Sequence, residues 1–194
     1  MIPKKTGLLF GSFNPIHNGH LILASYMAAF TDLDEVWFVI SPQNPLKEKI
    51  SLLADYHRLA LVRLAIEDHP KMKAEDIEFK MPKPSYTIDT LTWLNEKYPD
   101  RSLIVISGTD IFHSFHKWKN YKQLLDQYCM YVYPRPGYSL GEYAGHPHIS
   151  LFDAPNLEIS SSFIRKGIKQ KKNMQFWMPE KVYDYILEMH FYEK

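Results

Sequence analysis

The stretch Gly11–His20 most constrains the fold, because it lies between an apolar run and a helical pattern. Leu8–Phe10, directly before it, has the character of a buried strand, and Leu21–Phe30 is typical of a helix without proline or glycine. The free N–H groups at a helix start, together with the positive end of the helix dipole, attract anions. We therefore expect a strand-to-helix turn that binds phosphate, with Asn18 as the N-cap of the helix.

His17 and His20 are three residues apart, a spacing that brings both side chains to one face of a helix start. Both rings can then donate hydrogen bonds to one anion, and Gly11 and Gly19 leave room for a ligand to approach the backbone. Surface histidines and a metal site are the other interpretations. Zinc is disfavoured because no cysteine cluster or acidic third ligand lies nearby. The stretch matches neither G-x-G-x-x-G nor the Walker pattern, so the prediction is a phosphate turn of another kind.

Apolar runs and helical patterns alternate along the rest of the chain. The predicted strands are Glu35–Ile40, Ile77–Phe79, Leu103–Ile106, Tyr128–Tyr133 and Ile149–Phe152. Because Ile77 and Phe79 alternate with charged neighbours, we expect the strand at Ile77–Phe79 to have one wetter face. The predicted helices are Leu52–Asp68 with Ser51 as N-cap, Pro84–Lys97, a helix from Ser160, and Glu180–Met189. Such alternation predicts one α/β domain over residues 1–194, Rossmann-like and doubly wound around a mainly parallel sheet. We expect about residues 156–194 to be helical and packed on the sheet, and ligands to bind beyond the carboxyl ends of the strands.

The composition disfavours several other classes of protein. Hydrophobic residues make up 45% of the chain, charged residues 23%, and the formal net charge is +1, so we expect no nucleic-acid binding. The sequence has no apolar signal segment and no apolar run long enough for a bilayer, which predicts a cytoplasmic protein without membrane contacts. The single Cys129 excludes a disulfide within the chain, and its apolar neighbours predict a buried thiol. A monomer and a homo-oligomer are both compatible with the sequence.

A second candidate phosphate site lies at Ser160–Arg165, where three serines precede a helical pattern. The triplet is either a helix cap alone or a phosphate-facing helix start to which Arg165 adds a bidentate guanidinium. Trp118 has two interpretations as well, a core residue or an aromatic platform for a ligand. Asp110 can be an N-cap, and Lys47 a solvated side chain.

Taken together, these motifs resemble a known family. The H-x-G-H core of Gly11–His20 and the later Ile159–Arg165 are similar to the signature pair of the nucleotidylyltransferase superfamily. Between them, the stretches that resemble bacterial nicotinate-nucleotide adenylyltransferases, in the same order, are Pro84–Leu91, Gly108–Asp110, Trp118 and Arg135–Tyr138. The resemblance covers nearly the whole chain. It implies a Rossmann-like sheet and the transfer of AMP from ATP to nicotinate mononucleotide, which gives deamido-NAD and pyrophosphate.

The resemblance also implies roles for single residues. His17, His20 and Arg165 would be catalytic and would hold the ATP phosphates. The other ATP-binding residues would be Gly11, Ser12, Phe13, Gly19, Gly108, Asp110, Ile159, Ser161 and Ser162. The residues for nicotinate mononucleotide would be Lys47, Thr87, Trp118 and Arg135. Where the family usually has two prolines followed by His-Lys, this chain has Asn44–Lys47, so the role of that histidine cannot be transferred.

The implied reaction needs no general base, because the acceptor phosphate is already an anion at neutral pH. A Mg²⁺ ion held by ATP and water would assist the leaving pyrophosphate, and no protein ligands for it are expected. Replacing His20 with alanine is expected to lower turnover on the order of a hundredfold or more. The alternatives are adenylyl or cytidylyl transfer to another phosphomonoester such as phosphopantetheine, and a nucleotide-binding sensor without chemistry. The residues do not separate nicotinate from nicotinamide mononucleotide.

Overall fold

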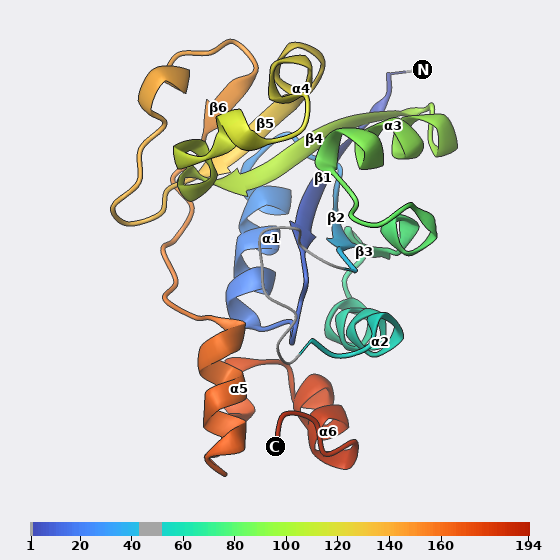
Figure 1. Cartoon of the computed structure of the whole chain (residues 1–194), viewed down its shortest axis with the longest axis vertical. Coiled ribbons are helices and arrows are strands. Elements are labelled where there is room, and N and C mark those ends of the chain that lie inside the picture. The colour runs from blue at the N-terminus through green and yellow to red at the C-terminus, as the bar shows by residue number, and fades with distance from the viewer. Residues whose placement is uncertain (1, 43–51) are drawn as a thin grey trace.

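The computed structural model describes residues 2–42 and 52–194, and a six-stranded sheet forms its centre (Figure 1). The strands are β1 (Lys4–Gly11), β2 (Glu35–Ile40), β3 (Met72–Glu75), β4 (Arg101–Gly108), β5 (Cys129–Tyr133) and β6 (Ile149–Leu151). All neighbouring strands are parallel, in the order β3-β2-β1-β4-β5-β6. This order reverses direction between β1 and β4 and confirms the predicted Rossmann-like sheet.

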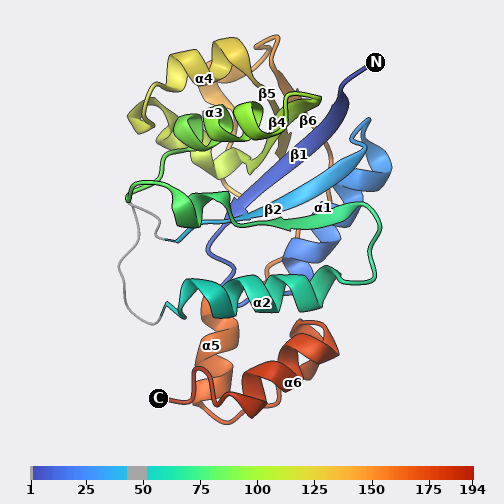
Figure 2. The ribbon, with the colours of Figure 1, turned by 90° about the vertical axis from the view of Figure 1, so that its right-hand side faces the viewer.

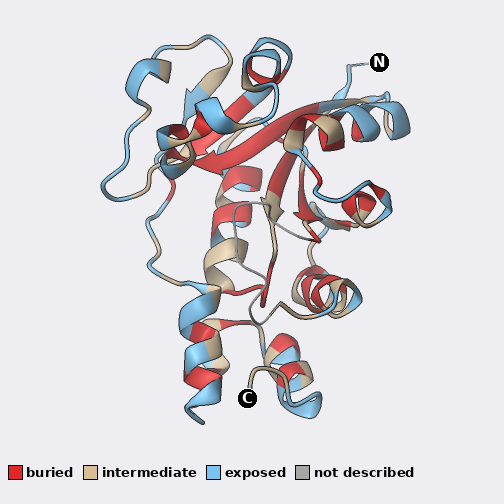
Figure 3. Ribbon diagram, in the orientation of Figure 1, coloured by how far each residue is buried: buried red, intermediate tan, exposed pale blue. Residues whose placement is uncertain are grey.

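Helices cover both faces of the sheet (Figure 2). One face packs against α1 (Asn18–Phe30) and α2 (Asp55–Ile66), and the other against α3 (Thr87–Lys97) and α4 (Tyr121–Gln127). Alternate residues of one strand enter the two cores, so Phe38 joins the α1/α2 core and Trp37 the α3/α4 core. Figure 3 shows the central strands as largely buried. A strand such as β2 is apolar throughout because both of its faces are covered.

The C-terminal segment is helical. It contains α5 (Ser161–Lys169), the short 3₁₀ helix η5 (Gln175–Trp177) and α6 (Glu180–Glu188). Helix α6 contacts α2, and its Val182 and Ile186 belong to the same buried core as the apolar residues of α1 and α2. In Figures 1 and 2 this segment lies at the end of the molecule where α1 begins. The start of α5 is therefore close to the turn that follows β1.

The predicted strand at Ile77–Phe79 is wrong. These residues belong to the 3₁₀ helix η1 (Ile77–Lys80), and the edge strand β3 lies just before it. Glu78, expected on a wet face, is buried because the hydroxyls of Ser85 and Thr90 donate hydrogen bonds to its carboxylate. Two apolar residues at alternate positions do not distinguish a strand from a short helical turn.

Two local predictions in other elements are also wrong. Helix α1 begins at Asn18, so its N-cap is His17, and the Asn18 side chain instead donates a hydrogen bond to the Phe176 carbonyl at 2.9 Å. Cys129 is exposed rather than buried. It is the first residue of β5 and therefore lies at the rim of the sheet rather than in the apolar centre of the strand.

The remaining predicted strands and helices are confirmed, although their ends shift by up to four residues. The helix predicted from Leu52 begins at Asp55, and its predicted N-cap Ser51 lies outside the described residues. The short 3₁₀ helices are η2 (Thr109–His113), η3 (Phe115–Lys117) and η4 (Gly141–Tyr143). Within residues 2–42 and 52–194, no helix has the length and apolar character needed to cross a bilayer.

Candidate active site

The predicted nucleotide-binding residues lie where β1 and β4 end side by side. Gly11 is the last residue of β1 and pairs with Ile40 at the end of β2. Gly108 is the last residue of β4 and pairs with Tyr133 at the end of β5. In a sheet of this strand order, ligands bind beyond these ends, at the point where the order reverses.

The turn after β1 is shaped by the packing of Phe13. This residue has a φ of 43°, and its ring is buried beside Gly11. A Cβ atom added to Gly11 would lie 2.8 Å from the ring, so this position requires glycine. The Phe13 ring also meets His20 edge to face, with the ring centroids 5.1 Å apart. The turn therefore orients His20 through packing.

His17 and His20 stack on each other, with ring centroids 3.7 Å apart and planes inclined by 22°. The backbone N–H of His17 donates a hydrogen bond to Nδ1 of His20 at 3.3 Å, so a neutral His20 carries its proton on Nε2. His17 is 4% exposed, and its Nδ1 has no hydrogen-bond partner in the described part of the chain. Burial, with a smaller contribution from the charge of Arg135, lowers the pKa of His17 to about 4. The ring is therefore neutral at pH 7.

The start of α5 docks directly on this turn. Ser160 caps the helix, because its hydroxyl accepts a hydrogen bond from the backbone N–H three residues later at 3.2 Å. Ser161 Oγ donates to the Pro15 carbonyl at 2.9 Å, and Arg165 Nη1 donates to the Asn14 carbonyl at 2.8 Å. Capping therefore accounts for one serine of the triplet, and the two motifs meet although Asn14 and Arg165 are 151 positions apart.

The other residues of Ile159–Arg165 that are predicted to bind ATP lie around this junction, which we call the phosphate clamp. Arg165 Nη2 donates to the hydroxyl of the exposed Ser162 at 3.3 Å. Ile159 packs beside Gly19, where an added Cβ would lie 3.3 Å from the Ile159 Cβ atom. The positive ends of the α1 and α5 dipoles and the guanidinium converge here, so the junction attracts anions.

The Asn14 side chain ties the turn to two further segments. Its Oδ1 atom accepts a hydrogen bond from the backbone N–H of Leu53 at 3.2 Å and one from the hydroxyl of Tyr192 at 2.7 Å. Burial raises the pKa of Tyr192 above its usual value, so this hydroxyl keeps its proton and acts as a donor. The turn after β1 is thus held by α5, by Leu53 before α2 and by Tyr192 after α6.

Asp110 and Arg135 form a separate cluster at the ends of β4 and β5. Arg135 Nε lies 3.9 Å from Asp110 Oδ1, and Arg135 Nη2 donates to the hydroxyl of Tyr133 at 3.3 Å. The Arg135 backbone N–H donates to Thr109 Oγ1 at 2.8 Å. A Cβ atom on Gly108 would fall 2.3 Å from Asp110 Oδ1, so Gly108 leaves the space that this carboxylate occupies. The cluster lies at the same edge of the sheet as the histidine turn.

Thr87 and Trp118 come from the side of the sheet covered by α3 and α4. Thr87 is the first residue of α3, and Trp118 is half-buried against the α3/α4 core. Their segments are joined by an ion pair between Lys119 Nζ and the Asp89 carboxylate at 2.7 Å. Lys47 and the rest of Asn44–Lys47 lie outside the described residues. The segments that carry Thr87 and Trp118 are therefore neighbours, and the placement of Lys47 stays a prediction.

Arg58 is a buried charged residue that the sequence motifs do not single out. Its guanidinium is fully buried and donates hydrogen bonds to the carbonyls of Ser12 at 2.6 Å, Ser41 at 2.7 Å and Pro42 at 3.2 Å. It also donates to the Asp55 carboxylate at 2.6 Å. Arg58 therefore ties the end of β1 to the end of β2. Its only signal in the sequence is an arginine on the core-facing side of a helical pattern.

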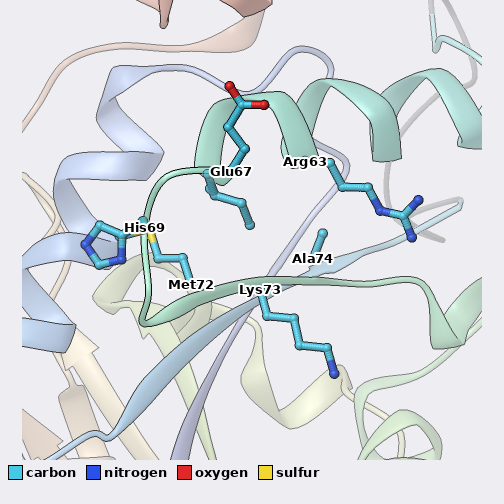
Figure 4. Close-up of a pocket in the computed structure, with 7 residues that line it drawn as sticks. Arg63, Glu67, His69, Met72, Lys73 and Ala74 are labelled. Atoms are coloured by element: carbon cyan, nitrogen blue, oxygen red, sulfur yellow. The ribbon is translucent and has the colours of Figure 1, made fainter.

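A hollow of about 350 Å³ lies away from this edge, between the end of α2 and β3 (Figure 4). Its lining consists of Arg63, Ile66, Glu67, His69, Met72, Lys73 and Ala74. Met72 pairs with Val36 near the start of β2, so the hollow is at the amino end of the strands and takes no part in the site. In the ranges that the structure covers, no group of three or more His, Cys, Asp or Glu side chains could hold a metal ion.

Comparison with known proteins identifies the family. The sequence profile of the cytidylyltransferase-like family matches residues 8–167. The probable nicotinate-nucleotide adenylyltransferase of Flavobacterium psychrophilum is 52% identical over 192 residues, which cover 98% of this chain and 100% of that protein. The chain belongs to the nicotinate-nucleotide adenylyltransferase family. Another member, from Cytophaga hutchinsonii, is 50% identical over 188 residues, covering 97% of this chain and 98% of its own.

A solved structure agrees with the family fold. The nicotinic acid mononucleotide adenylyltransferase of Plasmodium falciparum, in complex with NaAD, superimposes with a TM-score of 0.82 and covers 98% of both chains. Its sequence identity is 21%, so this likeness supports the fold of the adenylyltransferase family and not the role of any single residue.

Proposed function

We propose that this adenylyltransferase transfers AMP from ATP to nicotinate mononucleotide, forming deamido-NAD and pyrophosphate. One observation carries the proposal most directly. Ser161 and Arg165 hold the backbone of the histidine turn at the edge of the sheet where nucleotides bind. The whole-length identity of 52% to a probable nicotinate-nucleotide adenylyltransferase supports the choice of acceptor.

In the proposed reaction, an oxygen of the acceptor phosphate attacks the α-phosphorus of ATP. A new P–O bond forms as the bond from the α-phosphorus to the bridging oxygen of the β-phosphate breaks, and pyrophosphate leaves with that electron pair. The nucleophile is already an anion, so no proton has to be removed. The enzyme must therefore align the two phosphates and neutralise their charge.

The residues of the turn and of α5 provide donors for these charges. We propose that His20 donates from Nε2 to an ATP phosphate, because its Nδ1 accepts from the backbone. Arg165 adds a permanent positive charge that is held over the turn by the Asn14 carbonyl. His17, neutral and buried at the helix start, provides a short-range hydrogen bond rather than a charge. These donors are in place before the substrate binds, which is the condition for electrostatic preorganisation.

We propose that the acceptor half of the site is formed by the start of α3 and by the segments that follow β4 and β5, together with Lys47. We propose that Trp118 stacks on the nicotinate ring, that Thr87 holds it through the start of α3, and that Arg135 and Lys47 bind its phosphate or carboxylate. The anion preference of a helix start suits the nicotinate carboxylate. Gly108 and Asp110 would face the adenosine.

We propose that Mg²⁺ takes part as an ion held by ATP and water. The side chains around the phosphate-facing turn are N–H and hydroxyl donors, which suit phosphate oxygens, and the Asp110 carboxylate is paired with Arg135. When bound to the phosphates, the ion would neutralise charge on the leaving pyrophosphate. We propose the small molecules ATP and nicotinate mononucleotide as the partners of the site. A cytoplasmic location and the oligomeric state stay predictions.

The proposed function is tested by measuring pyrophosphate release from ATP with a panel of acceptors. Nicotinate mononucleotide, nicotinamide mononucleotide and phosphopantetheine are compared at equal concentration, with and without Mg²⁺. We expect the highest kcat/KM with nicotinate mononucleotide. A higher value for phosphopantetheine would replace the proposed acceptor, and binding of ATP without turnover on any acceptor would favour the nucleotide sensor.

A further inference from the structure

The start of α3 rests on a buried carboxylate. Glu78 is 3% exposed, and its two carboxylate oxygens accept hydrogen bonds from different residues. The Ser85 hydroxyl donates to Oε2 at 2.7 Å, and the Thr90 hydroxyl donates to Oε1 at 2.9 Å. Both donors are buried as well, Thr90 completely. Burial raises the pKa of the Glu78 carboxylate, and hydrogen bonds from the side chains of Ser85, Thr90 and Ser41 oppose that rise. Hydrogen bonds to the ionised carboxylate are stronger than those between neutral groups.

These two donors lie on either side of the residue proposed to hold the acceptor ring. Ser85 precedes the N-cap Tyr86, and Thr90 lies one turn into α3, so Thr87 is between two points that are both anchored to Glu78. Thr90 also returns hydrogen bonds to the Tyr86 carbonyl, from its backbone N–H at 3.0 Å and from its hydroxyl at 3.1 Å. The first turn of α3 is therefore anchored by buried hydrogen bonds to the Glu78 carboxylate.

The contacts of this turn on the solvent side are weaker. Lys119 Nζ pairs with Asp89 and lies 5.0 Å from the centre of the Tyr86 ring, but both members of the ion pair are more than a third exposed. Exposed pairs of this kind contribute little to stability. Of these polar contacts, those of the Glu78 carboxylate are buried and those of Lys119 are exposed.

We propose that Glu78 is a positioning residue for the acceptor: its hydrogen bonds to Ser85 and Thr90 hold Thr87 where the acceptor ring binds. This inference rests on the proposed function. Glu78 does not touch the substrate, so its loss should weaken acceptor binding and leave ATP binding and the chemical step nearly unchanged.

The chain offers a matched control three residues earlier. Glu75 is also buried, at 2% exposure, but its carboxylate accepts from Lys97 Nζ and from the Tyr98 hydroxyl, both at 3.0 Å. These donors are at the other end of the same helix. Glu75→Gln and Glu78→Gln therefore each replace a buried carboxylate at one end of α3, Glu75 from ion pairs with Lys73 and Lys97 and Glu78 from hydroxyl donors.

The experiment measures KM for both substrates and kcat in the two variants. For Glu78→Gln we expect the KM for nicotinate mononucleotide to rise about tenfold, because charge-assisted hydrogen bonds become neutral ones, with kcat and the KM for ATP changed by less than about twofold. Glu75→Gln should leave all three constants near the wild type. An equal rise in both KM values, or the same rise in Glu75→Gln, would overturn the proposal.

A second measurement requires no substrate. Hydrogen exchange of the peptide covering residues 85–94 should be faster in Glu78→Gln than in the wild type, and unchanged in Glu75→Gln. If Glu78→Gln does not fold, Ser85→Ala removes one donor and should show the same pattern at smaller size. Unchanged exchange in both would overturn the proposal. A wild type that cannot use nicotinate mononucleotide refutes the proposed function instead, and the exchange result still decides whether Glu78 holds α3.

Discussion

The ATP half and the acceptor half of the proposed site are built differently. In the ATP half, side chains from α5 donate directly to backbone carbonyls of the turn after β1, and Arg58 ties the same turn to β2. In the acceptor half, Thr87, Trp118 and Arg135 come from three separate elements, and an exposed ion pair joins two of them. One half is a single hydrogen-bonded unit, and the other is an assembly of independent pieces.

This difference suits the two substrates. The triphosphate presents the same charges in every adenylyl transfer, so its donors can be locked in place before binding. The acceptor is what distinguishes one such enzyme from another, and separate elements can change without disturbing the phosphate clamp. If the comparison is correct, perturbing the ATP half should reduce stability or turnover, whereas perturbing the acceptor half should mainly raise one KM.

Arg58→Met should have the largest effect. It removes a fully buried guanidinium that donates hydrogen bonds to five acceptors, the Asp55 carboxylate among them, so we expect the free energy of unfolding to fall by about 3–5 kcal/mol. Urea unfolding measures this loss. The control Arg63→Met changes an exposed arginine of the same helix and should cost less than about 0.5 kcal/mol. Similar costs for both variants would mean that the ATP half is not locked by Arg58.

The stability of the protein should fall in acid because of His17. Its pKa is lowered from 6.5 to about 4 in the folded state, so protons bind the unfolded chain first as the pH drops. The free energy of unfolding therefore has its full value, with respect to His17, above pH 6.5. It falls by up to about 3 kcal/mol as the pH drops from 6.5 to about 4. The free energy of unfolding, measured between pH 4 and pH 8, should depend less on pH in His17→Asn than in the wild type.

ATP should raise the pKa of His17, measured by NMR titration, because an anion favours the charged ring.

His20→Ala should lower kcat on the order of a hundredfold or more, because it removes a preorganised donor that we propose to face the ATP phosphates. Thermal unfolding should remain close to that of the wild type. The matched control is His69→Ala, which changes a histidine beside the hollow at the opposite edge of the sheet. Near-normal kcat in folded His20→Ala would remove His20 from the proposed chemistry.

Trp118→Ala should have the smallest of these effects. Loss of aromatic stacking is expected to raise the KM for the acceptor by about tenfold and to leave the KM for ATP unchanged. Phenylalanine at this position should restore most of the affinity. Trp93→Ala, an exposed tryptophan on α3, is the control and should change neither constant. A rise in the KM for ATP would show that the two halves are coupled.

The motifs Gly11–His20 and Ser160–Arg165 could be found in the sequence because each is a local pattern. Each combines a helix start with residues that bind anions. The helix start itself was misplaced by one residue, since His17 takes the N-cap that Asn18 was expected to fill. Arg58 and Glu78 could not be predicted. A buried charge depends on partners brought together by the fold, and a one-dimensional pattern assigns charged residues to the surface. The same logic misled the interpretation of Glu78 as a residue on a wet strand face.

The hydrogen bond between Tyr192 and Asn14 spans 178 positions of the chain, and the contact with Arg165 spans 151. During synthesis the ribosome releases the N-terminal turn long before either partner emerges. The turn that we propose to bind the triphosphate is therefore synthesised early and completed late. A nascent chain that has made only the early strands therefore has the histidines without the contacts from α5 and Tyr192 that hold their turn, and the proposed ATP site is complete only after Tyr192 has emerged.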